Sequence, residues 1–118
     1  MPADTPMSVV LLWHMHQPDY RDLRAGTIHL PWTYLHAIKD YVDMAAHLEQ
    51  VPKARAVVNF VPILLEQIDD YARQIGAHLK SGGAIRDPLL SSLASPLLPE
   101  EADQRRALIH ACLRANAR

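Results

Sequence analysis

The chain has 118 residues, of which 49% are hydrophobic and 21% charged, a balance typical of globular proteins that argues against disorder. Its formal net charge of -1 gives no long-range field to attract polyanions, so neither nucleic acid nor a membrane surface is expected as a partner. The single cysteine, Cys112, cannot form an internal disulfide, and the N-terminus lacks the basic segment of a signal peptide, so a cytoplasmic location is expected.

The first part of the chain alternates strand and helix patterns. Residues 8–14 form an apolar, β-branched run typical of a strand buried on both faces. A polar loop separates this strand from a helix over residues 31–50. A second strand over residues 56–60 leads into a second helix over residues 62–75, with Gly76 placed as its left-handed cap. This order predicts a parallel βαβ unit within an α/β fold.

Each predicted helix has apolar residues at helical spacing, which indicates one buried face. In the first helix they are Leu35, Ile38, Val42, Ala45 and Leu48, and in the second they are Val61, Leu64, Leu65, Ile68, Ala72 and Ile75. The charged side chains between them are expected to face solvent, namely Lys39, Asp40, Asp43, His47, Asp69 and Asp70.

The chain changes character after Gly76. Asp87 and Pro88 are a plausible N-cap and first residue of a short helix, and a last helix begins around Pro99. We therefore divide the chain into an α/β part, residues 1–76, and a helical insertion, residues 77–118, truncated at the C-terminus. Two parallel strands cannot form a sheet with an interior, so we expect the isolated chain to be marginally stable, aggregating or oligomeric.

His14 and His16 are the most notable polar residues, because they share one side of the first strand at its C-terminal end. Parallel α/β enzymes bind their substrates at that end. Three interpretations stay open: histidines with only a structural role, substrate contacts, or the first ligand pair of a zinc hydrolase. Asn59, at the end of the second strand, is either an internal hydrogen-bonding group or a substrate contact.

Aromatic residues gather at the start of the first helix. Trp32, Tyr34 and His36 could stack on the apolar faces of sugar rings or could belong to the core. No nucleophile motif, phosphate-binding glycine loop or pair of strand-end carboxylates is present in the sequence, so we assign no catalytic residue.

Three segments together resemble glycoside hydrolase family 57, in particular its amylopullulanase or α-amylase branch. They are residues 9–18 (VVLLWHMHQP), residues 30–41 (LPWTYLHAIKDY) and residues 59–67 (NFVPILLEQ). The resemblance covers about the first 75 residues well, and it implies a retaining enzyme that hydrolyses or transfers α-glucans. It further implies an incomplete, seven-stranded (β/α) barrel, of which this chain would contain the first two (β/α) units followed by a helical segment.

The resemblance also implies roles for individual residues. His14, His16 and Gln17 would line the innermost sugar subsite and hydrogen-bond to glucosyl hydroxyls, with Trp32, His36 and Asn59 as neighbours. The catalytic glutamate and aspartate of the family lie on later strands, so the chain is expected to be inactive alone. An α-glucan or maltooligosaccharide is the expected ligand, without cofactor or metal.

Two alternatives accompany this interpretation: a fragment of a zinc-dependent barrel hydrolase, and a non-catalytic module that binds carbohydrate or another protein. A second chain that supplies the remaining strands is also compatible with the sequence.

Overall fold

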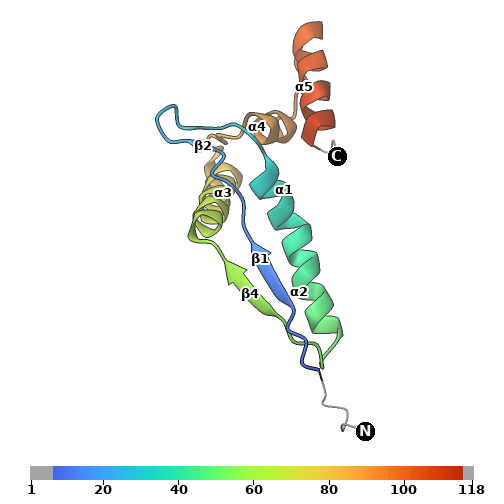
Figure 1. Cartoon of the computed structure of the whole chain (residues 1–118). Coiled ribbons are helices and arrows are strands. Elements are labelled where there is room, and N and C mark those ends of the chain that lie inside the picture. The colour runs from blue at the N-terminus through green and yellow to red at the C-terminus, as the bar shows by residue number, and fades with distance from the viewer. Residues whose placement is uncertain (1–6, 116–118) are drawn as a thin grey trace, which may run out of the picture.

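A computed structural model describes residues 7–115 and contains two short sheets and five helices in that part of the chain (Figure 1). The elements in chain order are β1 (Leu12–Met15), β2 (Arg21–Asp22), β3 (Thr27–Ile28), α1 (Trp32–Ile38), α2 (Asp40–Gln50), β4 (Val57–Phe60), α3 (Pro62–Ser81), α4 (Pro88–Ala94) and α5 (Ala102–Ala115).

β1 and β4 form a two-stranded parallel sheet, and α1 and α2 form the connection between them. His14 lies opposite Asn59 in the register, and α3 follows β4 directly. The mixed α/β class and the predicted order of strand, helix, strand and helix are therefore confirmed.

The prediction that the first strand is buried on both faces is wrong. Leu12 is 61% exposed, and Val10 just before the strand is 74% exposed, whereas Met15 is buried. In the described part of the chain, β1 pairs with β4 alone, so one of its edges and most of one face lie open. The strand is also shorter than expected, beginning at Leu12 rather than at Ser8.

The predicted first helix is divided in two at Lys39. The backbone of Lys39 has φ -126° and ψ -76°, outside the helical region, so α1 ends before it and α2 begins after it. The apolar face predicted for this helix is mostly solvent-exposed, since Ile38 and Val42 are exposed and α2 has no buried residue. No other element within residues 7–115 packs closely enough over α2 to bury that face.

The predicted end of the second helix at Gly76 is wrong, because α3 continues to Ser81. Its cap is Gly82, which has φ 70° in the left-handed region. His78 and Lys80 occupy the last turn, where positive side chains suit the negative end of the helix dipole. The residues that end the helix therefore lie about one and a half turns after Gly76, the predicted cap.

The buried face of α3 is more polar than predicted. It consists of Leu64, Gln67, Asp70, Tyr71 and Gln74. Leu65, by contrast, is half exposed, and Asp70 is buried and paired with Arg86 instead of facing solvent. α1 and two loops lie against this face, and the backbone groups of the loops need hydrogen-bond partners there.

The loop after β1 contains an antiparallel hairpin that sequence analysis missed. Arg21 pairs with Ile28 and Asp22 with Thr27, and Gly26 adopts φ 68° in the turn. Oδ1 of Asp22 accepts hydrogen bonds from the backbone of Arg24 and Ala25. Two-residue strands are too short for an alternating pattern, so only the buried Ile28 could have indicated them.

The C-terminal helices extend away from the sheet (Figure 1). Asp87 caps α4 as predicted, since its Oδ1 accepts hydrogen bonds from the backbone N–H groups of Leu89 and Leu90. The radius of gyration is 19.6 Å, whereas a compact chain of this length would have about 13–14 Å. The fold is thus elongated, and none of the helices in residues 7–115 is long and apolar enough to cross a membrane.

Candidate functional site

A polar face lies at the carboxyl ends of β1 and β4. The imidazole rings of His14 and His16 stack with their centroids 5.8 Å apart and their planes 20° from parallel. Met15 between them is buried on the other side of the strand, as the two-residue period requires. Asn59 lies opposite His14 in the neighbouring strand, so its side chain projects to the same face. All three polar side chains are exposed.

Gln17 is held between two tyrosines. Its Oε1 accepts a hydrogen bond of 3.0 Å from the hydroxyl of Tyr20, and its Nε2 donates one of 3.4 Å to the hydroxyl of Tyr41. A carboxamide offers two donors and two acceptor lone pairs. Each end of Gln17 therefore keeps one unused bonding position, which suits a sugar hydroxyl that both donates and accepts.

Tyr20 stays protonated at neutral pH, which it must to donate to Gln17. Partial burial raises the pKa of Tyr20 above that of an ordinary tyrosine, and the nearby Tyr41 raises it further. The ring of Tyr20 also meets Trp32 edge to face, with centroids 5.8 Å apart. Gln17 and Trp32 are thus connected through Tyr20.

His36 is connected to Gln17 on the other side. Its ring stacks on Tyr41 with centroids 6.2 Å apart, and its Nδ1 contacts Oδ2 of Asp40 one turn along the chain. The pKa of Asp40 is lowered by Lys39 first and by His36 second, so this carboxylate is ionised at neutral pH. An ionised Asp40 orients the imidazole through its Nδ1.

Trp32 and His36 line a pocket of about 590 Å³ between α1, α4 and α5. The other residues that line it are Leu35, Ile38, Lys39, Asp40, Leu89, Leu93, Cys112 and Ala115. The strand-end side chains His14, His16 and Asn59 do not line it.

The structure therefore divides the predicted site residues into two groups. His14, His16 and Asn59 form the strand-end face, and Trp32 and His36 form one wall of the pocket. Gln17 is linked to the pocket group through its two tyrosines.

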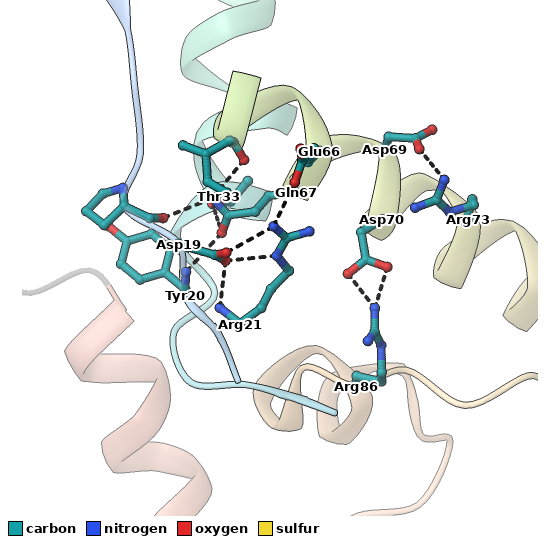
Figure 2. Close-up of polar contacts among 12 residues, drawn as sticks. Asp19, Tyr20, Arg21, Thr33, Glu66, Gln67, Asp69, Asp70, Arg73 and Arg86 are labelled. Atoms are coloured by element: carbon teal, nitrogen blue, oxygen red, sulfur yellow. Dashed lines mark hydrogen bonds and ion pairs between the residues drawn. The ribbon is translucent and has the colours of Figure 1, made fainter. Parts of the chain in front are cut away.

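The first acidic residue after β1 in the sequence, Asp19, is engaged in an ion pair. Both carboxylate oxygens of Asp19 accept hydrogen bonds from the guanidinium of Arg21, which also reaches Glu66 at 3.2 Å (Figure 2). The bond from the Arg21 side chain is the main reason that the pKa of Asp19 is lowered. A carboxyl group with a lowered pKa is a poor proton donor at neutral pH.

No cluster of three or more His, Cys, Asp or Glu side chains suited to hold a metal occurs among residues 7–115. A zinc site built on His14 and His16 would need its further ligands from elsewhere.

Sequence analysis missed three residues that organise this region: Tyr20, Tyr41 and Gln67. Tyr20 lies three residues after Gln17 and Tyr41 ends the segment 30–41, but spacing alone could not show that both reach Gln17. Gln67 lies on the buried face of α3 and bonds the backbone of Tyr20 and Pro18. A polar amide three residues after Leu64 on that face was the signal available in the sequence.

Comparison with protein families shows which family the chain belongs to. The family described as Glycosyl hydrolase family 57 matches residues 10–105, which is most of the chain. No curated protein and no solved structure matches. The match includes both strands and all of the residues in the two groups described above, and the chain belongs to glycosyl hydrolase family 57.

Proposed function

We propose that the chain supplies sugar-binding residues to a retaining enzyme that hydrolyses or transfers α-glucans. The observation that carries the proposal is the strand-end face, where His14, His16 and Asn59 project together at the carboxyl ends of two parallel strands. Ligands of parallel α/β folds bind at these strand ends. Membership of the glycosyl hydrolase family supports a carbohydrate as the ligand.

The chemistry of this face suits a glucosyl ring. A neutral imidazole and a carboxamide each present both a donor and an acceptor, which match hydroxyl groups that can act as either. Such groups also stabilise a ring on which positive charge develops as the glycosidic bond breaks. Trp32 adds an aromatic surface on which the apolar face of a sugar can stack.

The catalytic carboxylates are proposed to lie outside this chain, on further (β/α) units of an incomplete seven-stranded barrel. There a glutamate would attack the anomeric carbon while an aspartic acid protonates the departing oxygen. The chain alone would then bind sugar without cleaving it. These units would come from a continuation of the same reading frame or from a second chain.

Binding of maltohexaose tests the proposal directly. We expect the whole 118-residue chain to bind this sugar in a calorimetric titration, and His14→Ala and His16→Ala to weaken binding by about tenfold each, the worth of one well-made polar contact. His47→Ala, which changes an exposed histidine on α2, is the matched control and should leave the affinity unchanged. No binding by the unmodified chain, or an equal loss in the control, would reject the proposal.

Metal analysis of the same preparation separates the zinc alternative. Stoichiometric zinc, removed by a chelator and lost in His14→Ala, would place the histidine pair in a metal site instead.

A further inference from the structure

The carboxamide of Gln67 uses all of its hydrogen-bonding capacity inside the protein. Its Oε1 accepts a bond of 3.1 Å from the backbone N–H of Tyr20 and another of 3.1 Å from the hydroxyl of Thr33. Its Nε2 donates bonds of 2.9 Å to the carbonyl of Pro18 and 3.2 Å to the carbonyl of Ile63. The side chain is 1% exposed, so water does not compete for these bonds.

The partners determine which way the amide points. The N–H of Tyr20 can only donate, and the carbonyls of Pro18 and Ile63 can only accept. A reversed amide would place like groups opposite one another at three of the four bonds. The arrangement around Gln67 therefore has one stable orientation, which connects α3 to the loop after β1 and to the first turn of α1 (Figure 2).

Three of the four groups that Gln67 bonds lie outside α3, and they lie close to Gln17 and Trp32, two of the proposed sugar contacts. Pro18 follows Gln17 directly, and the hydroxyl of Tyr20 donates to Oε1 of Gln17. Thr33 follows Trp32, whose ring meets that of Tyr20 edge to face.

We infer that Gln67 is a positioning residue that fixes Gln17 and Trp32 relative to one another for sugar binding. The inference rests on the proposed function, because only a bound sugar makes that relative position matter. The hydrogen bonds of Gln67 go to neither of the two side chains, so it acts through the backbone of Pro18 and Tyr20 and through Thr33.

Gln74 offers a matched control within the same helix. It is also a buried glutamine of α3, and its Oε1 accepts a bond of 2.8 Å from the backbone of Arg86, on the loop before α4. Replacing either glutamine by leucine removes a buried amide from one face of one helix. Only Gln67→Leu releases the loop that carries Gln17.

The test measures maltohexaose affinity of the 118-residue chain with Gln67→Leu, Gln67→Glu and Gln74→Leu. Gln67→Glu keeps both acceptors but puts an oxygen opposite the carbonyls of Pro18 and Ile63, so it isolates the donor half of the amide. We expect both Gln67 variants to bind about tenfold more weakly or worse, because a contact displaced by about an ångström loses much of its value. Gln74→Leu should bind as the unmodified chain does.

Hydrogen exchange of the Tyr20 amide gives a readout that needs no sugar. It should become faster in Gln67→Leu and stay slow in Gln74→Leu, with the amides of α3 protected in both. Unchanged affinity or unchanged exchange in the Gln67 variants, or an equal loss of affinity in Gln74→Leu, overturns the inference. If the unmodified chain binds no sugar, the proposed function fails, and the exchange data alone then decide whether Gln67 holds the loop.

Discussion

The hydroxyl of Tyr71 on α3 donates a hydrogen bond of 2.6 Å to Oδ2 of Asp87, whose other oxygen caps α4. Both side chains are almost fully buried. One carboxylate therefore joins the long helix to the start of the helical segment that follows it. The bond exists only while the tyrosine keeps its proton.

Stability should consequently fall at alkaline pH. Burial raises the pKa of Tyr71 first, and the hydrogen bond to Asp87 and the charges of Asp87 and Asp70 raise it further. The folded protein then retains this proton where the unfolded chain, with a tyrosine pKa of about 10, loses it. The stabilisation that this proton provides is therefore complete below a pH of about 10 and declines as the pH rises above that value. Urea titrations at pH 8 to 11 should show the free energy of unfolding decline, and Tyr71→Phe should make this decline smaller.

Asp87→Ala should destabilise the protein by about 2 kcal/mol or more, because it removes the cap of α4 and leaves the buried hydroxyl of Tyr71 without its partner. Asp87→Asn keeps an acceptor for the cap, and its Nδ2 can donate to the hydroxyl oxygen of Tyr71, so it should cost less. Asp103→Ala, at an exposed position on α5, is the control and should change little. Urea unfolding at one protein concentration measures all three, and equal losses for Asp87→Ala and Asp103→Ala would contradict the expectation.

Gly76 within α3 and Gly82 at its C-cap should respond to alanine with opposite signs. Gly76→Ala should stabilise by about 0.5–1 kcal/mol, because the position is helical and nothing lies within 4 Å of an added Cβ. Gly82→Ala should destabilise by about 1 kcal/mol, because its φ of 70° is unfavourable for any residue with a Cβ. Thermal melts of the two variants side by side provide the check, and a shared sign would place the end of the helix elsewhere.

Tyr41→Phe should weaken maltohexaose binding by about threefold, the effect of one modest hydrogen bond. The variant keeps a ring to stack on His36 but removes the hydroxyl that accepts from Gln17. Tyr34→Phe is the control, because Tyr34 packs against Tyr71 instead. Titration calorimetry measures the affinity of both variants. A larger loss of affinity in Tyr34→Phe than in Tyr41→Phe would mean that the hydroxyl of Tyr41 does not orient Gln17 for sugar binding.

The open strands should make the isolated chain associate. Leu12→Lys places a charge on an exposed position of β1 and should reduce the sedimentation coefficient toward that of a monomer. Leu79→Lys, at an even more exposed position near the end of α3, should leave the sedimentation coefficient unchanged. A monomer with a sharp cooperative melt in the unmodified chain would contradict the expectation.

Features of this fold that depend on neighbouring residues could be predicted from the sequence. The two parallel strands follow from their apolar, β-branched runs, and the shared face of His14 and His16 follows from the two-residue period of a strand. The cap at Asp87 follows from the preference of an N-cap for a short polar side chain. The break at Lys39 could not be predicted in this way, because the apolar spacing continues straight through it.

The polar face of α3 could not be read from hydrophobic spacing either. Apolar residues mark a buried face only when an apolar surface covers it, and here the backbone N–H groups of two loops lie against Gln67 and Gln74 and bond to them. Tyr41 and Gln67 could not be found for a different reason: each bonds to a segment that is far away in sequence, and that pairing exists only in the folded chain. Tyr20 lies only three residues after Gln17, but spacing does not show which side chain its hydroxyl reaches.

The row of polar partners along α3 also limits how this protein can change. Gln67 bonds the loop after β1, whereas Asp70 and Gln74 both bond Arg86 on the loop before α4, all from one side of a single helix. Deleting or inserting one residue among them would rotate everything beyond that point by about 100°. A substitution at one of these positions affects the contacts of that side chain, whereas a change in the length of the helix would break the bonds to both loops together.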